Sequence, residues 1–179
     1  MQFLLAVTGL FLWFSGSSIC AADIDPFKEN ASAKALVFVF ISNECPIANR
    51  YAPIIQRLHK QFSANQIAFY VVHADPSETQ AAIEQHAQDF GYTCGVLRDA
   101  DQELARRAGV HVSPEAAVFL PNGQRVYRGR IDNRYADLGI SRPEATERDL
   151  QTALEAIVQG KPVPVAETRA IGCYIPFQR

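Results

Sequence analysis

Short apolar runs alternate along the chain with longer segments whose apolar residues recur every three or four positions. The run from Ala35 to Ile41 contains no polar residue and predicts a buried strand. Pro46 to Phe62 has the spacing of a helix, in which Pro53 should cause a kink. A second apolar run, Ile67 to Val72, predicts the next strand. The pattern therefore begins as strand, helix, strand.

The rest of the chain continues this alternation. The remaining expected elements are a helix that Ser77 caps and that ends at Phe90, a short strand at Val96-Leu97, a helix from Gln102 to Ala108, strands at Ala116–Leu120 and Arg125–Arg130, and a helix that Thr146 caps and that ends at Gln159. Asn122-Gly123 between the last two strands is a strong hairpin signal. The order β-α-β-α-β-α-β-β-α predicts an α/β fold with a central mixed sheet and helices on both faces.

The first segment of the chain differs from the rest. Phe3 to Phe14 is almost wholly apolar, and the small residues of Cys20-Ala21-Ala22 follow it. This pattern indicates a signal peptide over residues 1–22 and a mature domain over residues 23–179, so we expect a periplasmic or secreted protein. The apolar run is short for a membrane span, so we expect no stable membrane insertion after cleavage. A lipid anchor at Cys20 is the alternative.

Composition narrows the class of function. The net charge is −2, and the chain has no basic run or alternation of aromatic and basic residues, so nothing favours nucleic acid as a partner. No glycine-rich nucleotide loop occurs, so we expect no organic cofactor, and the histidines lack the spacing of a metal site. Three cysteines remain after the leader, Cys45, Cys94 and Cys173. An odd count in an exported chain fits redox chemistry better than a scaffold of disulfides.

Cys45 is the strongest candidate for chemistry. It stands directly before Pro46, where the strand gives way to the helix. The first turn of a helix offers unpaired backbone N–H groups and the positive end of the helix dipole, and both favour thiolate over thiol. Glu44 beside it opposes the thiolate by its charge. The sequence therefore predicts a reactive cysteine, with a small buried hydrophobe as the alternative.

Several segments carry a resemblance to a known family. They are Asn43–Pro53, Val112-Ser113-Pro114, Pro114–Phe119, Tyr127–Asp132 and Gly172–Ile175. With the order of elements, they resemble the thioredoxin fold and, more closely, an exported peroxiredoxin-like branch of the redoxin (AhpC/TSA-like) proteins. The resemblance implies that Pro114 follows a cis peptide bond and sits against Cys45, which leaves the backbone before it free to pair with an extended substrate.

The chain also departs from the two best-known patterns of this superfamily. Ala48 stands where the thioredoxin pattern Cys-x-x-Cys has its second cysteine, so that dithiol is missing. In place of the peroxiredoxin pattern Pro-x-x-x-Thr-x-x-Cys, the chain has Phe38 for the proline and Ser42 for the threonine. The spacing to Pro53 also aligns Cys45 with the first thioredoxin cysteine, whereas the peroxidatic cysteine matches the second.

A second thiol is needed to resolve an oxidised Cys45. Cys173 belongs to one of the resembling motifs and lies on a tail after the last helix, and Gly172 before it allows a close backbone approach. The alternatives for Cys173 are a structural disulfide or an inert thiol. Cys94 is a weaker candidate, for which core packing is the simpler interpretation. His111 could face Cys45 and favour its thiolate, but an exposed loop position is the simpler interpretation.

The sequence therefore predicts an exported thiol-based oxidoreductase. Its partner is a protein or small-molecule thiol or disulfide. Cys45 attacks an oxidised sulfur to form a mixed disulfide, and Cys173 is the expected thiol that resolves this mixed disulfide. A thiol peroxidase that passes through a sulfenic acid is the first alternative. A Cu(I)-binding module that uses Cys45, Cys173 and His111 is another, and a redox-inert thioredoxin-fold domain is the last. The physiological substrate, the reductant and the oligomeric state stay open.

Overall fold

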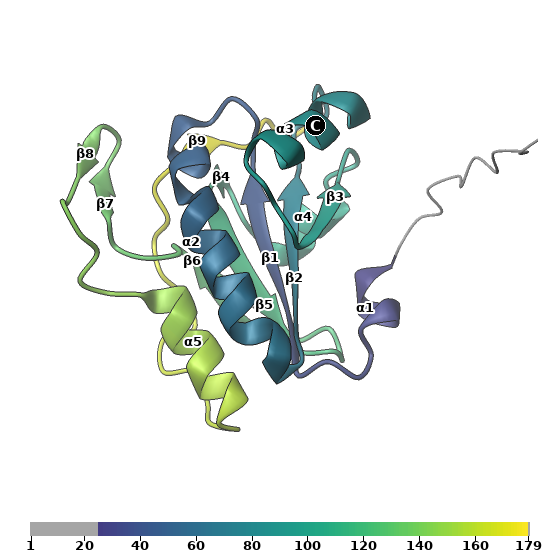
Figure 1. Ribbon diagram of the computed structural model, residues 1–179, viewed down its shortest axis with the longest axis vertical. Helices are drawn as coiled ribbons and strands as arrows, with labels where there is room; N and C mark the ends of the chain where they lie inside the picture. The colour runs from purple at the N-terminus through teal and green to yellow at the C-terminus, as the bar shows by residue number, and fades with distance from the viewer. Residues whose placement is uncertain (1–24, 179) are drawn as a thin grey trace, which may run out of the picture.

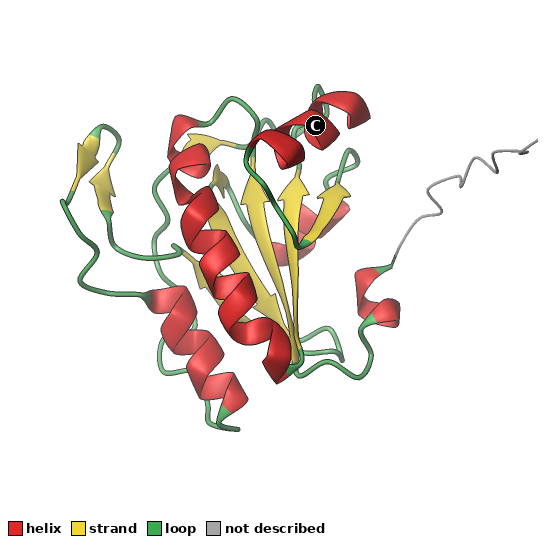
Figure 2. Ribbon diagram, viewed as in Figure 1, coloured by secondary structure: helices red, strands yellow, loops and turns green. Residues whose placement is uncertain are grey.

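The structure, a computed structural model, describes residues 25–178, so the signal peptide expected over residues 1–22 lies outside the described residues. The helices are α1 (Pro26–Glu29), α2 (Pro46–Phe62), α3 (Gln80–Asp89), α4 (Glu103–Ala108) and α5 (Asp149–Val158), with a short 3-10 helix, η1 (Ser63–Asn65), after α2. The strands are β1 (Ala35–Ile41), β2 (Ile67–His73), β3 (Gly95–Arg98), β4 (Val112–Ser113), β5 (Glu115–Phe119), β6 (Arg125–Gly129), β7 (Tyr135–Asp137), β8 (Ile140–Ser141) and β9 (Cys173–Tyr174). Figure 1 and Figure 2 show a central sheet with helices in front of it and behind it.

The five-stranded sheet has the order β3-β2-β1-β5-β6. β1 runs parallel to β2, and β2 runs parallel to β3, whereas β5 and β6 are antiparallel to their neighbours. The predicted α/β class with a mixed sheet is therefore confirmed. All seven residues of β1 are buried, because this central strand has helices over both faces.

Alternate residues of β1 face two different cores. Ala35, Val37, Val39 and Ile41 pack with apolar residues of α2 and α5, including Ile55, Leu58, Leu150 and Leu154. Leu36, Phe38 and Phe40 pack on the other face with Ala105 and Ala108 of α4, and Phe27 of α1 covers Phe38. The first core includes Cys45, so the packing of α2 on the sheet also fixes the position of this cysteine.

Two predicted helix caps are wrong. Thr79, and not Ser77, caps α3, because its hydroxyl accepts the Ala82 N–H at 3.2 Å, while the Ser77 hydroxyl donates to Asp75. Thr146 does not cap α5, which begins only at Asp149. The hydroxyl of Thr146 instead accepts a hydrogen bond from the Asn133 side-chain amide at 2.8 Å. In both cases the hydroxyl expected to cap the helix forms a hydrogen bond with another side chain, Asp75 for Ser77 and Asn133 for Thr146.

The chain after α5 returns along the whole sheet, which the sequence pattern does not show. Figure 1 shows this segment running from the far end of α5 to the end of the sheet where α2 begins. It first lies beside β6, where the Arg128 N–H donates to the Ala166 carbonyl at 2.9 Å. It then forms β9, which pairs antiparallel with β4. We call residues 160–178 the tail.

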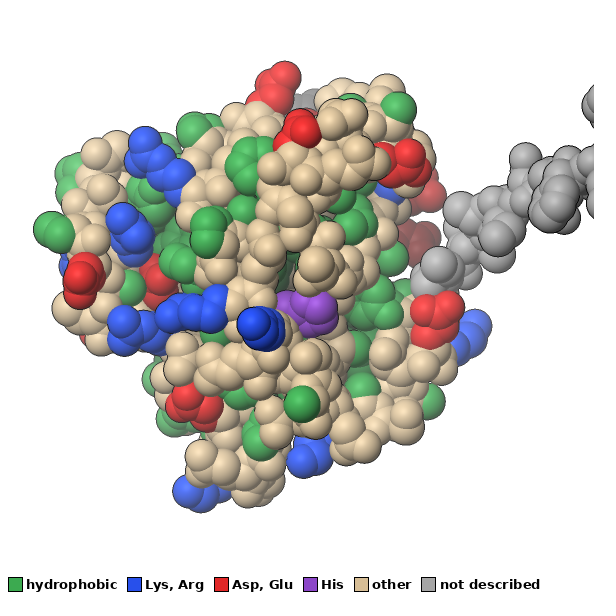
Figure 3. All heavy atoms as spheres, in the orientation of Figure 1, with side chains coloured by type: hydrophobic (Ala, Val, Ile, Leu, Met, Phe, Trp, Pro, Cys, Tyr) green, Lys and Arg blue, Asp and Glu red, His purple; other side chains and the backbone are tan. Residues whose placement is uncertain are grey.

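Over residues 25–178, no helix is both long enough and apolar enough to cross a bilayer. On the face seen in Figure 3, acidic and basic side chains both occur, with apolar ones scattered between them. Four large apolar side chains are exposed, and one of them, Tyr174, belongs to β9.

Candidate active site

Cys45 occupies the position that the sequence predicts, directly before the first turn of α2. Its backbone is extended, with φ −80° and ψ 106°, and Pro46 is the first helical residue. The Cys45 sulfur accepts a hydrogen bond from the Ala48 backbone N–H at 3.4 Å. One backbone amide of the first turn of α2 therefore points at Sγ, an arrangement that stabilises negative charge on sulfur.

The other side of Cys45 faces β4. Cys45 Sγ lies 2.9 Å from the Ser113 carbonyl oxygen, to which the thiol can donate. The Ser113–Pro114 peptide bond is cis, as the resemblance implies. Cys45 is only 1% exposed. The Ser113 carbonyl can thus accept a hydrogen bond from the Cys45 thiol, and the Ala48 N–H donates to the same sulfur. Solvent barely reaches Cys45.

The tail brings Cys173 to the same place. In the β4–β9 pair, Cys173 stands directly opposite Ser113. A side chain on Gly172 would put its Cβ 2.1 Å from the Ser113 carbonyl oxygen, so the close approach requires glycine. Burial raises the pKa of the Cys173 thiol to about 11, and a hydrogen bond and a charge interaction with Cys45 contribute. Cys173 therefore stays protonated at neutral pH beside Cys45.

Gln102 anchors the end of the tail. It was predicted as the first residue of a helix, but it precedes α4 with φ 60° and is fully buried. Its amide nitrogen donates to the carbonyls of Ala74 at 2.8 Å and Pro176 at 3.0 Å, and its oxygen accepts the Gln178 N–H at 2.8 Å. No sequence pattern distinguishes such an anchor from a surface glutamine at the start of a helix.

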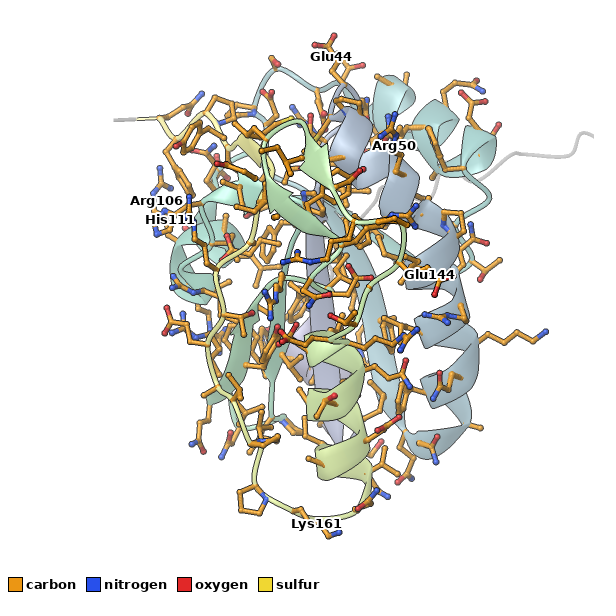
Figure 4. The ribbon with its side chains drawn as sticks, turned by 90° about the vertical axis from the view of Figure 1, so that its left-hand side faces the viewer. Glu44, Arg50, Arg106, His111, Glu144 and Lys161 are labelled. Atoms are coloured by element: carbon orange, nitrogen blue, oxygen red, sulfur yellow. The ribbon has the colours of Figure 1, made fainter. Side chains whose placement is uncertain are left out.

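His111 does not join the site. Its side chain is exposed, and its ring packs against Phe177 of the tail at a centroid distance of 6.3 Å. Figure 4 shows His111 on the flank of the molecule, beside Arg106, which also lies over Phe177. The loop position expected as the alternative is the correct one.

Cys94 lies away from Cys45 in the sheet. It directly precedes Gly95, which pairs with Tyr70 in β2, whereas Cys45 follows the opposite end of β1, where Ile41 pairs with His73. Its side chain packs against the core, and burial raises its pKa to about 11. The packing interpretation fits this position.

Ser42 and Glu44 precede Cys45, and the side chain of each engages something other than its sulfur. The Ser42 hydroxyl donates to a carboxylate oxygen of Glu78 at 2.9 Å, so it is not directed at Cys45 as the threonine comparison suggested. Glu44 is exposed, and in Figure 4 it points away from the molecule. Its charge is therefore screened by solvent and opposes the Cys45 thiolate only weakly.

Sequence reasoning missed a buried polar group next to this turn. His73 is fully buried at the end of β2, and its Nδ1 lies 2.6 Å from the carboxylate of Glu78. The ring of His86, also buried, meets the His73 ring at a centroid distance of 5.3 Å. The available signal was the position of His73 as the last residue of an apolar run.

The site offers little to a metal ion. Across residues 25–178, no group of three or more His, Cys, Asp or Glu side chains is arranged to hold one. Cys45, Cys94 and Cys173 are all free thiols. A Cu(I) site at Cys45 and Cys173 would lack the third ligand expected from His111, because His111 packs on Phe177.

A groove of about 520 Å³ lies beside β9. Its walls come from the turn between β7 and β8, including Leu138, and from the tail, including Gly172 and Tyr174. Figure 1 shows the β7–β8 hairpin standing away from the rest of the fold. The groove therefore leads to the strand that carries Cys173.

Comparison with solved structures places this fold among known proteins. An uncharacterised conserved protein of Geobacillus kaustophilus is 27% identical, with a TM-score of 0.70 over 80% of this chain and 77% of that one. A hypothetical protein of Sinorhizobium meliloti is 25% identical, with a TM-score of 0.71 over 84% of each chain. The dsbF protein of MTB, solved in mixed oxidised and reduced forms, is 17% identical, with a TM-score of 0.51 over 70% of this chain and 81% of that one. The last likeness shows the fold alone.

Comparison of sequences identifies the family. No curated protein matches the chain. The AhpC/TSA family matches residues 19–128, which is more than half of the chain and includes Cys45 and Pro114. The match ends within β6, so the tail with Cys173 lies beyond it. The chain therefore belongs to the AhpC/TSA family, as a redoxin of the thioredoxin superfamily.

Proposed function

We propose that this protein is an exported thiol-disulfide oxidoreductase in which Cys45 attacks and Cys173 resolves. The observation that carries the proposal is the arrangement of both cysteines around Ser113. Cys45 Sγ contacts the Ser113 carbonyl, and Cys173 pairs with Ser113 across two strands. Membership of a redoxin family supports thiol chemistry in general.

The two thiols have different roles because their surroundings differ. Cys45 lies at the N-terminus of α2, where Ala48 donates to its sulfur, so it is the attacking thiolate. Its sulfur attacks one sulfur of a partner disulfide, a mixed disulfide forms, and the other partner sulfur leaves as a thiolate that takes a proton from water. The Cys173 sulfur then attacks Cys45 and gives up its proton to the departing partner sulfur, so the partner leaves with both sulfurs reduced. Two electrons pass to the partner, and Cys45 and Cys173 become a disulfide.

Access to Cys45 requires the tail to move. Cys45 is 1% exposed and lies beside Cys173 of β9, so a partner disulfide would reach its sulfur only when the tail moves. β9 is two residues long and is the only partner of β4 in its sheet among the described residues. When β9 leaves, the backbone of β4 becomes free for an extended partner chain, for which the groove at Leu138 and Tyr174 offers room.

A thiol peroxidase is the second candidate, because the family match favours it. In that reaction the Cys45 thiolate attacks a peroxide oxygen, an alcohol or water leaves, and Cys45 becomes a sulfenic acid that Cys173 condenses with to release water. The contact of Ser42 with Glu78 speaks against this candidate, because the hydroxyl is engaged elsewhere.

One experiment separates the two candidates. Reduced protein is mixed either with a small aromatic disulfide or with hydrogen peroxide, and the loss of the Cys45 thiol is followed by peptide mass spectrometry. The proposal predicts rapid exchange with the disulfide and release of one thiol for each attack. Hydrogen peroxide should oxidise Cys45 no faster than it oxidises a free thiol. Cys45→Ser should abolish exchange and Cys94→Ser should leave it unchanged. Rapid oxidation by peroxide would instead favour the peroxidase.

Export is part of the proposal and has its own test. The apolar segment over residues 1–22 supports it. Expression of the full chain in a bacterium, followed by fractionation and N-terminal sequencing, should find the protein outside the cytoplasm with its first residue near Asp23. A full-length protein in the cytoplasm would contradict export but would leave the thiol chemistry open.

A further inference from the structure

Behind the turn that leads into Cys45 lies a set of buried polar side chains that the thiol chemistry above does not use. Glu78 follows β2 and is 9% exposed. Its Oε1 accepts hydrogen bonds from the Ser42 hydroxyl at 2.9 Å and from the Asn43 backbone N–H at 2.7 Å. Its Oε2 lies 2.6 Å from Nδ1 of His73. The carboxylate therefore joins the end of β2 to the turn before Cys45.

The carbonyl of Asn43 is held from a second direction. The Asn49 side-chain amide in α2 donates to the Asn43 carbonyl at 2.9 Å. The Oδ1 of Asn49 lies 2.9 Å from Nε2 of His86 in α3, and because that oxygen can only accept, Nε2 carries the hydrogen. The His86 ring rests edge to face against His73. Both backbone polar groups of Asn43 are thus fixed by side chains backed by buried histidines.

Glu78 is the charged member of this group. Burial raises the pKa of Glu78, but hydrogen bonds from His73, Asn43 and Ser42 outweigh burial and leave the pKa below its usual range. At neutral pH Glu78 is therefore a carboxylate, whose hydrogen bonds are stronger than those of a neutral acceptor. Burial, followed by the neighbouring His73, lowers the pKa of His86, so His86 is neutral at that pH.

The turn connects Glu78 to the reactive sulfur. Asn43 lies two residues before Cys45, and the Cys45 N–H closes the turn by donating to the Ser42 carbonyl at 3.2 Å. We propose that Glu78 is a positioning residue for the chemistry of Cys45, which holds Ser42 and Asn43 so that Sγ stays at the Ala48 N–H. This inference rests on the proposed function, because it assigns a role at the same site.

Position and charge predict opposite effects of Glu78 on the thiol. If Glu78 acts through position, it favours the Cys45 thiolate, because it keeps Sγ at the N-terminus of α2. If it acts only as a negative charge, it disfavours the thiolate. Glu78→Asp keeps the charge, but the shorter side chain cannot reach Asn43 and His73 together. Glu78→Gln removes the charge, keeps an oxygen for Asn43 and offers an amide N–H to His73, whose Nδ1 accepts it once the ring hydrogen is on Nε2.

The experiment measures alkylation of Cys45 by iodoacetamide against pH, read at the Cys45 peptide by mass spectrometry. Opening of the tail changes the alkylation rate by the same factor at every pH. The midpoint of the rate against pH therefore reports the ionisation of the Cys45 thiol. The inference predicts that Glu78→Asp raises the midpoint by about half a pH unit, which is roughly a threefold loss of thiolate below the midpoint. Glu78→Gln should leave the midpoint unchanged or lower it. Amide hydrogen exchange at Asn43 should become faster in Glu78→Asp and stay slow in Glu78→Gln.

Asp99→Asn is the matched control. Asp99 also binds backbone amides with its carboxylate, those of Leu104 and Ala105 at 3.1 and 2.8 Å, but at the start of α4. Asp99→Asn should therefore leave the midpoint of Cys45 alkylation unchanged. If the midpoint falls in Glu78→Gln while Glu78→Asp matches the natural protein, Glu78 acts by its charge alone and the inference is overturned. If the midpoint changes in neither variant, Glu78 has no role in the ionisation of Cys45. Alkylation needs neither Cys173 nor a partner disulfide, so a failure of the proposed function would be seen separately, as absent disulfide exchange.

Discussion

Cys45 and Cys173 lie beside each other but are held in opposite ways. Cys45 follows a strand whose seven residues are all buried, and it begins the long helix α2. Cys173 lies in a strand of two residues on the tail, next to Tyr174, which is 83% exposed. The core therefore fixes one thiol, while a two-residue strand on the tail holds the other. Under the proposed function, one movement of the tail would both uncover Cys45 and withdraw Cys173.

The largest expected effect comes from removing the delivered thiol. Cys173→Ser leaves Cys45 at the start of α2, so the first attack on a small disulfide should still release one thiol. The mixed disulfide should then persist, and turnover with an added reductant should fall by at least about 100-fold. Stopped-flow absorbance and intact mass measure the two stages. Unchanged turnover would show that Cys173 does not resolve the mixed disulfide on Cys45. Cys94→Ser is the control and should leave turnover unchanged.

A smaller effect should follow from forcing the tail away from β4. In Gly172→Ala the added Cβ would meet the Ser113 carbonyl oxygen, so β9 must shift. We expect the equilibrium constant for the Cys45–Cys173 disulfide against glutathione to fall roughly tenfold, because overpacking of this kind costs about 1–3 kcal/mol. The measurement is quantification of both redox forms by alkylation and mass. Gly139→Ala adds a methyl group at a positive φ but meets nothing within 4 Å, so it shows what backbone strain alone does to this constant.

Weakening the anchor at the end of the tail should expose Cys45. Asparagine tolerates the left-handed backbone of Gln102, with φ 60°, but its shorter side chain cannot reach Pro176 and Gln178. Gln102→Asn should therefore raise the alkylation rate of Cys45 about fivefold, the effect of losing a net hydrogen bond of about 1 kcal/mol. Gln80→Asn on the exposed face of α3 should not change the rate. An unaltered rate in Gln102→Asn would mean that the tail end does not control access.

The smallest expected effect is a dependence of stability on pH that comes from buried His86. Burial and the neighbouring His73 hold the pKa of His86 below 6.5, so the folded protein binds this proton less readily than the unfolded chain. The stability contributed by neutral His86 is present above pH 6.5 and is lost as the pH falls below it. The free energy of unfolding in urea should decline from pH 8 to pH 5, and His86→Gln should flatten the decline. A steeper decline in the variant would contradict this assignment.

The sequence predicts the fixed part of the site better than the delivered part. The bounds of β1 and α2 are as expected, because an unbroken apolar run and the Cys45-Pro46 step are strong local signals. α2 also continues unbroken past Pro53. β9 is too short to show periodicity, and its pairing with β4 depends on contacts between distant parts of the chain.

Buried polar residues are the part of the fold that the sequence specifies least. It leaves His73 and His86 at surface or satisfied core positions, and the structure places both in the core, where the Glu78 carboxylate and the Asn49 amide contact one nitrogen of each ring. Gln102 likewise leaves its expected helix because the tail supplies partners for its amide. Side-chain partners far away in sequence decide these positions, so no local pattern contains them.

We propose that Cys45 and Cys173 form one redox pair. To test this pairing, the purified chain is oxidised with a small disulfide and its cysteine peptides are mapped without reduction. We expect one dominant cross-link, between the peptides of Cys45 and Cys173, which disappears in Cys173→Ser while Cys45 stays open to alkylation after reduction. A cross-link between Cys45 and Cys94, or oxidised protein in which Cys173 remains a free thiol, would contradict it.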